Sequence, residues 1–214
     1  EYGTSQFRAF NDILYRYRMQ QDEIKLNSTS LVYRYILETL YFATNGDSWK
    51  RNKNWLTSVN HCTWDEVDCN TDDEVISLIF SSNDVVGTLP KELGNLSKLA
   101  LLGLGSNSLH GSIVSEIGQL TDLEYLEFRL NEFTASIPSE LGLLTRLTYL
   151  SLRNNKLSNT VPNELGQLTN LKYLYLHKNN LSGAIPSVLC NNSWADSITI
   201  DCETVEECEC CYCW

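Results

Sequence analysis

The chain has 214 residues, of which 43% are hydrophobic, and a formal net charge of −11 at pH 7. This hydrophobic content suffices for a packed core, so the composition argues against global disorder. The acidic balance argues against nucleic acid as a partner, because phosphate binding requires clustered positive charge. No run of about 18 apolar residues is present, so we expect no membrane span in this chain. Residues 1–5 lack the basic and apolar segments of a signal peptide, as expected for a mature or trimmed form.

The chain begins with two predicted helical segments. Residues 1–28 contain a Tyr/Arg run, Tyr15–Arg18, that suits either a cap helix or an assembly arm, and we describe them as an N-terminal helical arm. Apolar residues between Ser30 and Ala43 recur with helical spacing and predict an amphipathic helix. The sequence Asn45–Asp47 is a suitable end for that helix.

Residues 75–190 contain five copies of a 24-residue pattern, which start at Val75, Leu99, Leu123, Leu147 and Leu171. A fixed period of this length is typical of a solenoid, in which each unit buries its apolar face against its neighbours. Positions 1, 4 and 6 of each copy are apolar, and the spacing of two between the last pair is that of a strand. We therefore predict an α/β solenoid whose short strands pair in parallel.

Three further repeat positions have predicted structural roles. Position 9 is always Asn, and we expect these amides to form a buried ladder that satisfies backbone groups, at Asn83, Asn107, Asn131, Asn155 and Asn179. All four prolines fall at position 16, where a fixed φ suits an extended segment on the convex side. Glycine at position 20 is predicted to supply a tight turn, at Gly94, Gly118, Gly142 and Gly166.

Residues 191–214 are predicted to form a Cys-rich, acidic C-terminal cap. The eight cysteines lie only at the flanks of the repeats, which is typical of disulfide-closed caps in an oxidising compartment: Cys62, Cys69, Cys190, Cys202, Cys208, Cys210, Cys211 and Cys213. The tail cysteines could also bind zinc or another soft metal, but we expect disulfides and no metal site. Four glycosylation sequons agree with secretion, at Asn27, Asn95, Asn180 and Asn191.

The repeat signature Asn-x-Leu-Ser-Gly-x-Ile-Pro-x-x-Leu, at Asn179–Leu189, resembles the plant-type extracellular leucine-rich repeat. That family includes receptor-kinase ectodomains and polygalacturonase inhibitors of the cell wall. The segments Leu37–Trp49 and Cys62–Cys69 are similar to its N-terminal cap, although Glu66 stands where that cap usually has Gly.

The resemblance implies a curved solenoid with the parallel sheet on its concave side and an N-terminal cap over residues 29–74. A disulfide between Cys62 and Cys69 is the firmest pairing, whereas Cys190–Cys202 is only one of several possible tail pairings. The Cys-rich tail departs from the plant pattern and resembles secreted leucine-rich-repeat proteins of diatoms and related algae.

Side chains at repeat positions 3, 5 and 7 are expected to face outward on the concave sheet. The last three copies place tyrosines beside cations there, whereas the first two carry small or apolar residues. Tyr and Arg dominate interface energetics, and tyrosine rings also suit sugars, but Tyr is common in strands generally. We predict a partner-binding strip at Tyr125, Tyr149, Tyr173, Tyr175, Glu127, Arg129, Arg153 and His177.

No catalytic or cofactor-binding motif is recognisable in the sequence. Glu127 and Arg129 share a strand face and are expected to form an ion pair rather than an acid/base site. We therefore expect a secreted, extracellular, non-enzymatic module, at the cell surface or cell wall, that has no cofactor and binds a protein partner or joins an extracellular assembly. The alternatives are a cell-wall glycan-binding protein and the ectodomain of a membrane receptor.

Overall fold

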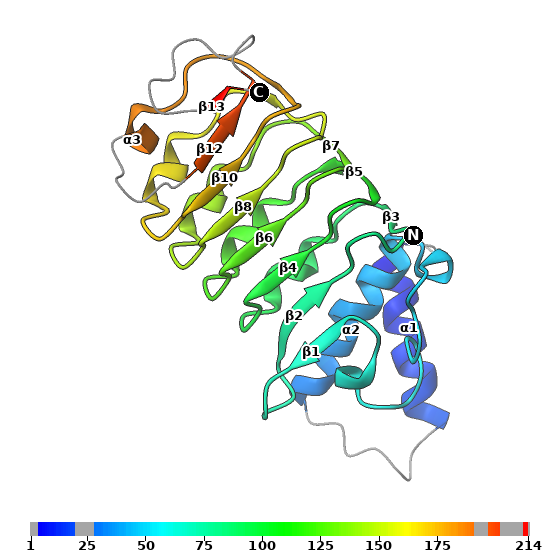
Figure 1. Cartoon of the computed structure of the whole chain (residues 1–214). Coiled ribbons are helices and arrows are strands. Elements are labelled where there is room, and N and C mark those ends of the chain that lie inside the picture. Colours follow the sequence, from blue (N-terminus) through cyan, green and yellow to red (C-terminus); the bar gives the residue numbers. More distant parts are fainter. Residues whose placement is uncertain (1–3, 20–27, 191–196, 202–211, 214) are drawn as a thin grey trace.

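The computed structural model of the chain describes residues 4–19, 28–190, 197–201 and 212–213. Its main element is an eight-stranded sheet, parallel except between its first two strands. The strand order is β1 (Val67–Cys69), β2 (Val75–Ile79), β4 (Leu101–Gly103), β6 (Tyr125–Glu127), β8 (Tyr149–Ser151), β10 (Tyr173–Tyr175), β12 (Ser197–Ile200) and β13 (Tyr212–Cys213). Figure 1 shows these strands lining one face of a curved stack. The predicted α/β solenoid is confirmed.

The chain returns from each strand through a short edge strand and a helical turn on the opposite face. The edge strands are β3 (Val86–Gly87), β5 (Ser108–Ser112), β7 (Glu132–Thr134), β9 (Ser158–Asn159) and β11 (Asn180–Leu181). The helical turns are the 3-10 helices η3 (Lys91–Asn95), η4 (Ser115–Gln119), η5 (Ser139–Leu143) and η6 (Asn163–Gln167), followed by the short helix α3 (Ser187–Cys190). Apolar residues from strands and turns fill the space between the two faces.

The predicted apolar positions form the core in columns along the stack. Leu102, Leu126 and Leu150 lie directly opposite one another in the register and are completely buried. A fully buried side chain of this size stabilises the fold by about 1.5–3 kcal/mol relative to an exposed one. Because each column continues through the neighbouring copies, no copy buries its apolar face alone.

The predicted asparagine ladder is present and connects each repeat to the one before it. The Asn107 side chain accepts hydrogen bonds from the backbone N–H groups of Asn83 and Val85, at 3.0 and 3.1 Å. Its amide group donates to the carbonyl oxygens of Phe80 and Leu104, both at 2.9 Å. Asn131 and Asn155 donate in the same way, and each accepts one hydrogen bond from the preceding turn, from the N–H groups of Leu109 and Phe133. The ladder therefore satisfies backbone groups where each strand ends.

The glycines at repeat position 20 have a different role from the predicted one. Gly118 lies inside η4 and does not adopt the left-handed conformation that favours glycine in a turn. A Cβ atom built on Gly118 would lie 2.4 Å from the carbonyl oxygen of Glu140 in the next copy. Glycine is therefore required at Gly94, Gly118 and Gly142 because the backbones of successive helical turns approach each other closely.

The N-terminal cap is built from helices α1 (Ser5–Met19) and α2 (Ser28–Ala43) and the 3-10 helices η1 (Gly46–Ser48) and η2 (His61–Thr63). The expected helix over Ser30–Ala43 is confirmed. Trp49, Trp55 and Trp64 are buried in one aromatic cluster with Phe80, so they are packing residues. Glu66, at the usual glycine position of this cap, has a left-handed φ of 67° and forms an ion pair with Arg51.

The strand ladder continues beyond Cys190, where we expected the array to end. Strand β12 pairs with β10 in the same parallel register, and Ile198 and Ile200 are buried in the core. The carboxylate of Asp201 accepts hydrogen bonds from the backbone N–H groups of Lys178 and Asn179, at 2.8 and 3.0 Å. An acidic side chain thus completes the last turn in place of an asparagine. The pairing of the tail cysteines lies outside what the structure describes.

Candidate protein-binding face

Strands β6, β8 and β10 bring the predicted tyrosines together on the exposed face of the sheet. Tyr125, Tyr149 and Tyr173 lie opposite one another in the register, and Tyr175 lies two residues further along β10. The Tyr125 and Tyr149 rings stack with their centroids 4.6 Å apart. The centroid of the Tyr149 ring lies 6.1 Å from that of Tyr173 and 5.6 Å from that of Tyr175. We call these four residues the tyrosine ladder.

The tyrosine ladder combines apolar ring surface with phenolic hydroxyl groups. Tyr173 is 38% exposed, and the other three rings are half-buried. Burial raises the pKa of Tyr125 to about 12, and the nearby carboxylate of Glu127 contributes to this rise. Burial also raises the pKa of Tyr149. The hydroxyl groups of both residues are therefore available as neutral hydrogen-bond donors.

Glu127 and Arg129 form the expected ion pair, and this pair shapes the neighbouring part of the face. The Glu127 carboxylate also accepts a hydrogen bond from the Ser81 hydroxyl, at 3.0 Å, which lies two repeats away. It can do so because the intervening residue is Gly105, where a Cβ atom would lie 2.7 Å from the carboxylate. Glu127 is only 5% exposed, so the prediction that it contacts a partner is wrong. Its role is structural.

His177 is likewise covered rather than presented to a partner. Its ring is 2% exposed, and Nδ1 lies 2.6 Å from the hydroxyl oxygen of Thr199 on β12. Burial lowers the pKa of His177, and the positive charge of Arg153 lowers it further. The sequence did not indicate this, because the strand that covers the ring lies beyond the expected end of the repeats.

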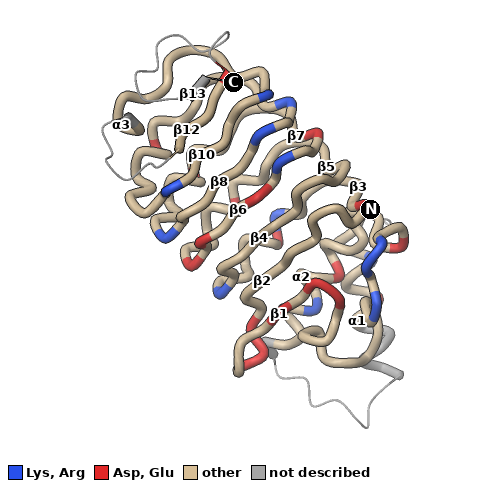
Figure 2. Tube along the Cα trace, viewed as in Figure 1, with Lys and Arg blue, Asp and Glu red and all other residues tan. Residues whose placement is uncertain are grey.

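The cationic residues of the face gather at one end of its strands. Figure 2 shows Lys and Arg at the ends of β6 and β8 that lie toward the edge strands. Arg129 and Arg153 are both half-buried there. The neighbouring Leu130, which is not part of the predicted strip, is 42% exposed at the same edge. Its exposure depends on a left-handed residue after the strand, which a hydrophobicity pattern does not reveal.

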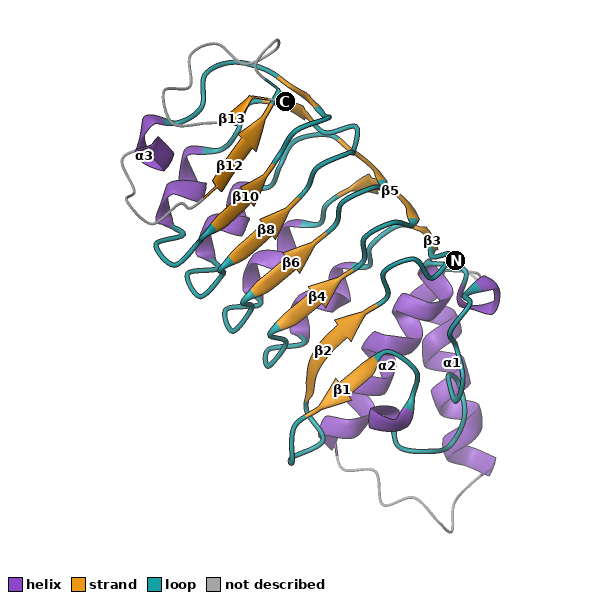
Figure 3. Cartoon of the chain, in the orientation of Figure 1, coloured by secondary structure: helices purple, strands orange, loops and turns teal. Residues whose placement is uncertain are grey.

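The first two repeats carry no aromatic side chains at the positions of the tyrosine ladder. Figure 3 shows β4 and then β2 continuing the sheet from β6 toward the N-terminal cap. Leu101 is 39% exposed there, and Gly103 provides no side chain where Glu127 stands on β6. The face is therefore divided into a part with small or aliphatic side chains over β2 and β4 and an aromatic part over β6, β8 and β10.

The glycosylation sequons that the structure describes lie away from the tyrosine ladder. Asn95 is exposed at the end of η3, on the opposite face of the stack, and Asn180 is exposed on edge strand β11. Asn27 and Asn191 lie outside the described residues. A glycan at Asn95 or Asn180 would leave the tyrosine ladder accessible.

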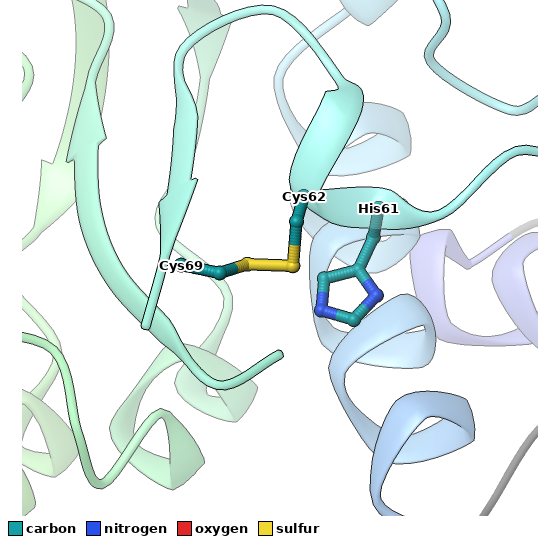
Figure 4. A group of neighbouring side chains, drawn as sticks. All are labelled: His61, Cys62 and Cys69. Carbon is teal, nitrogen blue, oxygen red and sulfur yellow. A yellow bond between two sulfur atoms is a disulfide. The ribbon is translucent and has the colours of Figure 1, made fainter. Parts of the chain in front are cut away.

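Cys62 and Cys69 form the predicted disulfide, with an S–S distance of 2.01 Å. Figure 4 shows His61 beside this bond, and in the described residues these three are the only group spaced to hold a metal ion. Metal-binding cysteines act as thiolates, so the oxidised pair does not offer that donor set. His61 is completely buried, and its Nε2 lies 3.1 Å from the backbone oxygen of Asp73. The group is a structural part of the cap.

A family described as "Leucine-rich repeat region" matches residues 78–205, and the chain belongs to this family. Among solved structures, a plant ice-binding protein is 30% identical over 86% of this chain and 58% of its own, with a TM-score of 0.72. The ectodomain of the receptor kinase SOBIR1 from Arabidopsis thaliana is 28% identical over 86% of this chain and 97% of its own, with a TM-score of 0.69.

The ectodomain of the Arabidopsis receptor kinase HAESA, in complex with an IDA peptide hormone, is 26% identical and has a TM-score of 0.67. It is similar to 84% of this chain, which spans 29% of its length. No curated protein matches the sequence. Within the described residues, no helix combines the length and apolar character needed to cross a bilayer. The chain therefore shares the leucine-rich-repeat fold of these plant proteins.

Proposed function

We propose that the chain is an extracellular, non-enzymatic recognition module that binds a protein or peptide along the tyrosine ladder. The observation that carries this proposal is the continuous contact of four tyrosine rings over three adjacent strands. Tyrosine supplies a large, rigid contact area that loses little side-chain entropy on binding. The rings are partly exposed on a sheet whose other face is fully occupied by the core.

The test replaces two residues of the face and measures the binding of proteins from the extracellular fraction of the source. Tyr149→Ala combined with Arg153→Ala should weaken binding by roughly 2 kcal/mol or more, as expected for interface hot spots. A matched control is Arg146→Ala, because Arg146 is exposed and forms ion pairs with Asp122 and Glu124 away from the ladder. Binding that survives the double change but is lost when residues 1–28 are removed would assign recognition to the N-terminal arm.

The extracellular location is supported by the disulfide Cys62–Cys69 and by the exposure of Asn95 and Asn180. Disulfides persist in oxidising compartments, and glycans require accessible sequons. Mass spectrometry of protein from its natural source should find a glycan on the peptide that contains Asn95. A membrane span in the full gene product would make the chain the ectodomain of a receptor, and retention on a cell-wall polysaccharide array would favour the glycan-binding alternative. The resemblance of the tail to algal proteins remains a prediction.

Binding to ice is a second candidate, favoured by the similarity to the plant ice-binding protein. One repeat position carries exposed hydroxyl groups beside the edge strands, at Thr88, Ser112, Ser136 and Thr160. An assay of ice recrystallisation separates the two functions. Inhibition by the wild-type chain that is lost in Thr160→Tyr, but retained in Tyr149→Ala, would favour ice binding.

A further inference from the structure

Leu130 combines an exposed apolar side chain with a backbone conformation that disfavours it. The side chain is 42% exposed, and φ is 54°, in the left-handed region. The same repeat position is also left-handed but polar in the other copies, at Ser82, Ser106, Asn154 and Lys178. Asparagine and glycine tolerate this region better than a branched aliphatic residue does. Neither packing in the core nor backbone geometry accounts for leucine here.

Arg153 carries a positive charge that its own repeat does not neutralise. In the preceding copy, Arg129 pairs with Glu127, two residues before it. Ser151 occupies the position equivalent to Glu127, and the buried Nε of Arg153 has no hydrogen-bond partner among the described residues. An unsatisfied buried polar group is rare and costly, and it therefore requires an explanation.

Leu130 and Arg153 are neighbours at the same edge of the tyrosine ladder. The backbone N–H of Leu130 donates a hydrogen bond to the carbonyl oxygen of Arg153, at 3.0 Å. Adjacent repeats thus present an apolar group and a cation that has no carboxylate partner among the described residues, and the charge of Arg153 acts on Tyr149. The net charge of −11 would repel a strongly acidic segment as a whole, whereas one carboxylate at Arg153 would meet a local positive charge.

We propose that the protein segment docked on the tyrosine ladder places one carboxylate side chain against Arg153 and an apolar side chain against Leu130. This inference rests on the proposed function and specifies the chemistry of the partner. The apolar contact excludes water from the ion pair and so strengthens it, as the rim of a hot spot does. The guanidinium N–H groups can donate two parallel hydrogen bonds to the carboxylate.

The experiment selects a displayed library of random short peptides on the immobilised, disulfide-intact chain. Peptides that enrich should share an Asp or Glu near an apolar residue. Synthetic copies should bind at least about tenfold more weakly to Arg153→Gln and to Leu130→Asn. Leu130→Asn is suited to the left-handed backbone and should fold at least as well as the wild type. Arg146→Gln should bind like the wild type, and changing the peptide's Asp or Glu to its amide should match the loss in Arg153→Gln.

Each outcome separates this inference from the proposed function. If Tyr149→Ala abolishes peptide binding but Arg153→Gln does not, the inference is overturned and the tyrosine ladder remains the binding face. If neither change weakens binding, both are overturned. Enriched peptides without an acidic residue would overturn the inference. So would a library that yields no binder while a sulfated polysaccharide binds through Arg153, because the ligand would then be a glycan.

Discussion

Single residues in this chain have roles that depend on what the next repeat contributes. Glu127 and Ser151 occupy equivalent positions on adjacent strands, yet the first neutralises an arginine and the second does not. Glu127 reaches Ser81 only because Gly105 lies between them. The repeat pattern predicts which way a side chain points, and the residues one or two repeats away decide whether it is accessible.

The asparagine ladder should contribute measurably to stability through each of its members. Asn131 accepts a hydrogen bond from Leu109 N–H and donates to the carbonyl oxygens of Leu104 and Phe128. Asn131→Ala leaves these buried backbone groups unpaired, so the free energy of unfolding should fall by about 1–3 kcal/mol. Chemical denaturation measures this. The exposed Asn163 provides the control, and an equal loss in Asn163→Ala would contradict a specific role for the ladder.

The two buried histidines should make the fold less stable in mild acid. Burial lowers the pKa of both His61 and His177 from an ordinary value of 6.5. Below that value the unfolded chain binds protons that the folded chain does not, so stability decreases as the pH falls through the histidine range. The denaturant concentration at the midpoint of unfolding should decrease as the pH is lowered from about 7.5 to 5.5. This pH range lies above that in which most carboxylates titrate.

A variant at one of these histidines provides the control for the pH effect. His177→Gln should reduce the dependence of stability on pH, whereas the same change at the exposed His110 should not. A pH dependence that is identical in both variants would show that His177 does not cause it.

At the scale of elements, the strands of the repeats and the packing order of the sheet were predictable. The 24-residue period fixes the register, and the apolar spacing fixes the buried face. Strand β12 was not predicted, although Ile198 and Ile200 continue the period, because the Cys-rich composition of residues 191–214 favours a separate cap. The burial of His177 by Thr199 was missed for the same reason.

The close approach of successive helical turns leads to a prediction that compares two glycines. A Cβ atom at Gly118 would meet the backbone oxygen of Glu140 at 2.4 Å, whereas one at Gly103 would meet the flexible end of Ile79 at 3.0 Å. Gly118→Ala should therefore destabilise the fold by about 1–3 kcal/mol, as overpacking does. Gly103→Ala should cost clearly less. Thermal or chemical unfolding of the two variants decides, and equal losses would rule out backbone contact as the cause.

At the scale of the whole molecule, the stack depends on its ends because interior repeats contact only their neighbours. The N-terminal cap covers the first repeat with α2 and with three buried tryptophans, and the disulfide closes its last loop. Stability in such a stack is distributed among neighbouring units and need not be lost everywhere at once.

Removal of the disulfide should therefore loosen one end before the rest. Replacing Cys62 and Cys69 together by Ser should lower the stability of the cap by roughly 2 kcal/mol, the value expected from the entropy of closing so short a loop. Hydrogen exchange should accelerate in β1 and α2 while the core strands β6 and β8 remain protected. Uniform acceleration along the chain would instead show that cap and repeats unfold as one unit.

The asparagine ladder also determines in which order the turns can be completed while the chain is being synthesised. The side chain of Asn107 completes the turn that contains Asn83 and Val85, and Asn179 serves Leu157 in the same way. Because the ribosome synthesises the earlier turn first, each turn lacks the side-chain amide that bonds its backbone N–H groups. That amide is supplied only when the next repeat has been synthesised. Asp201 closes the last turn. Consolidation of the stack thus trails synthesis by one repeat, and a nascent chain stopped within the array always ends in an unfinished turn.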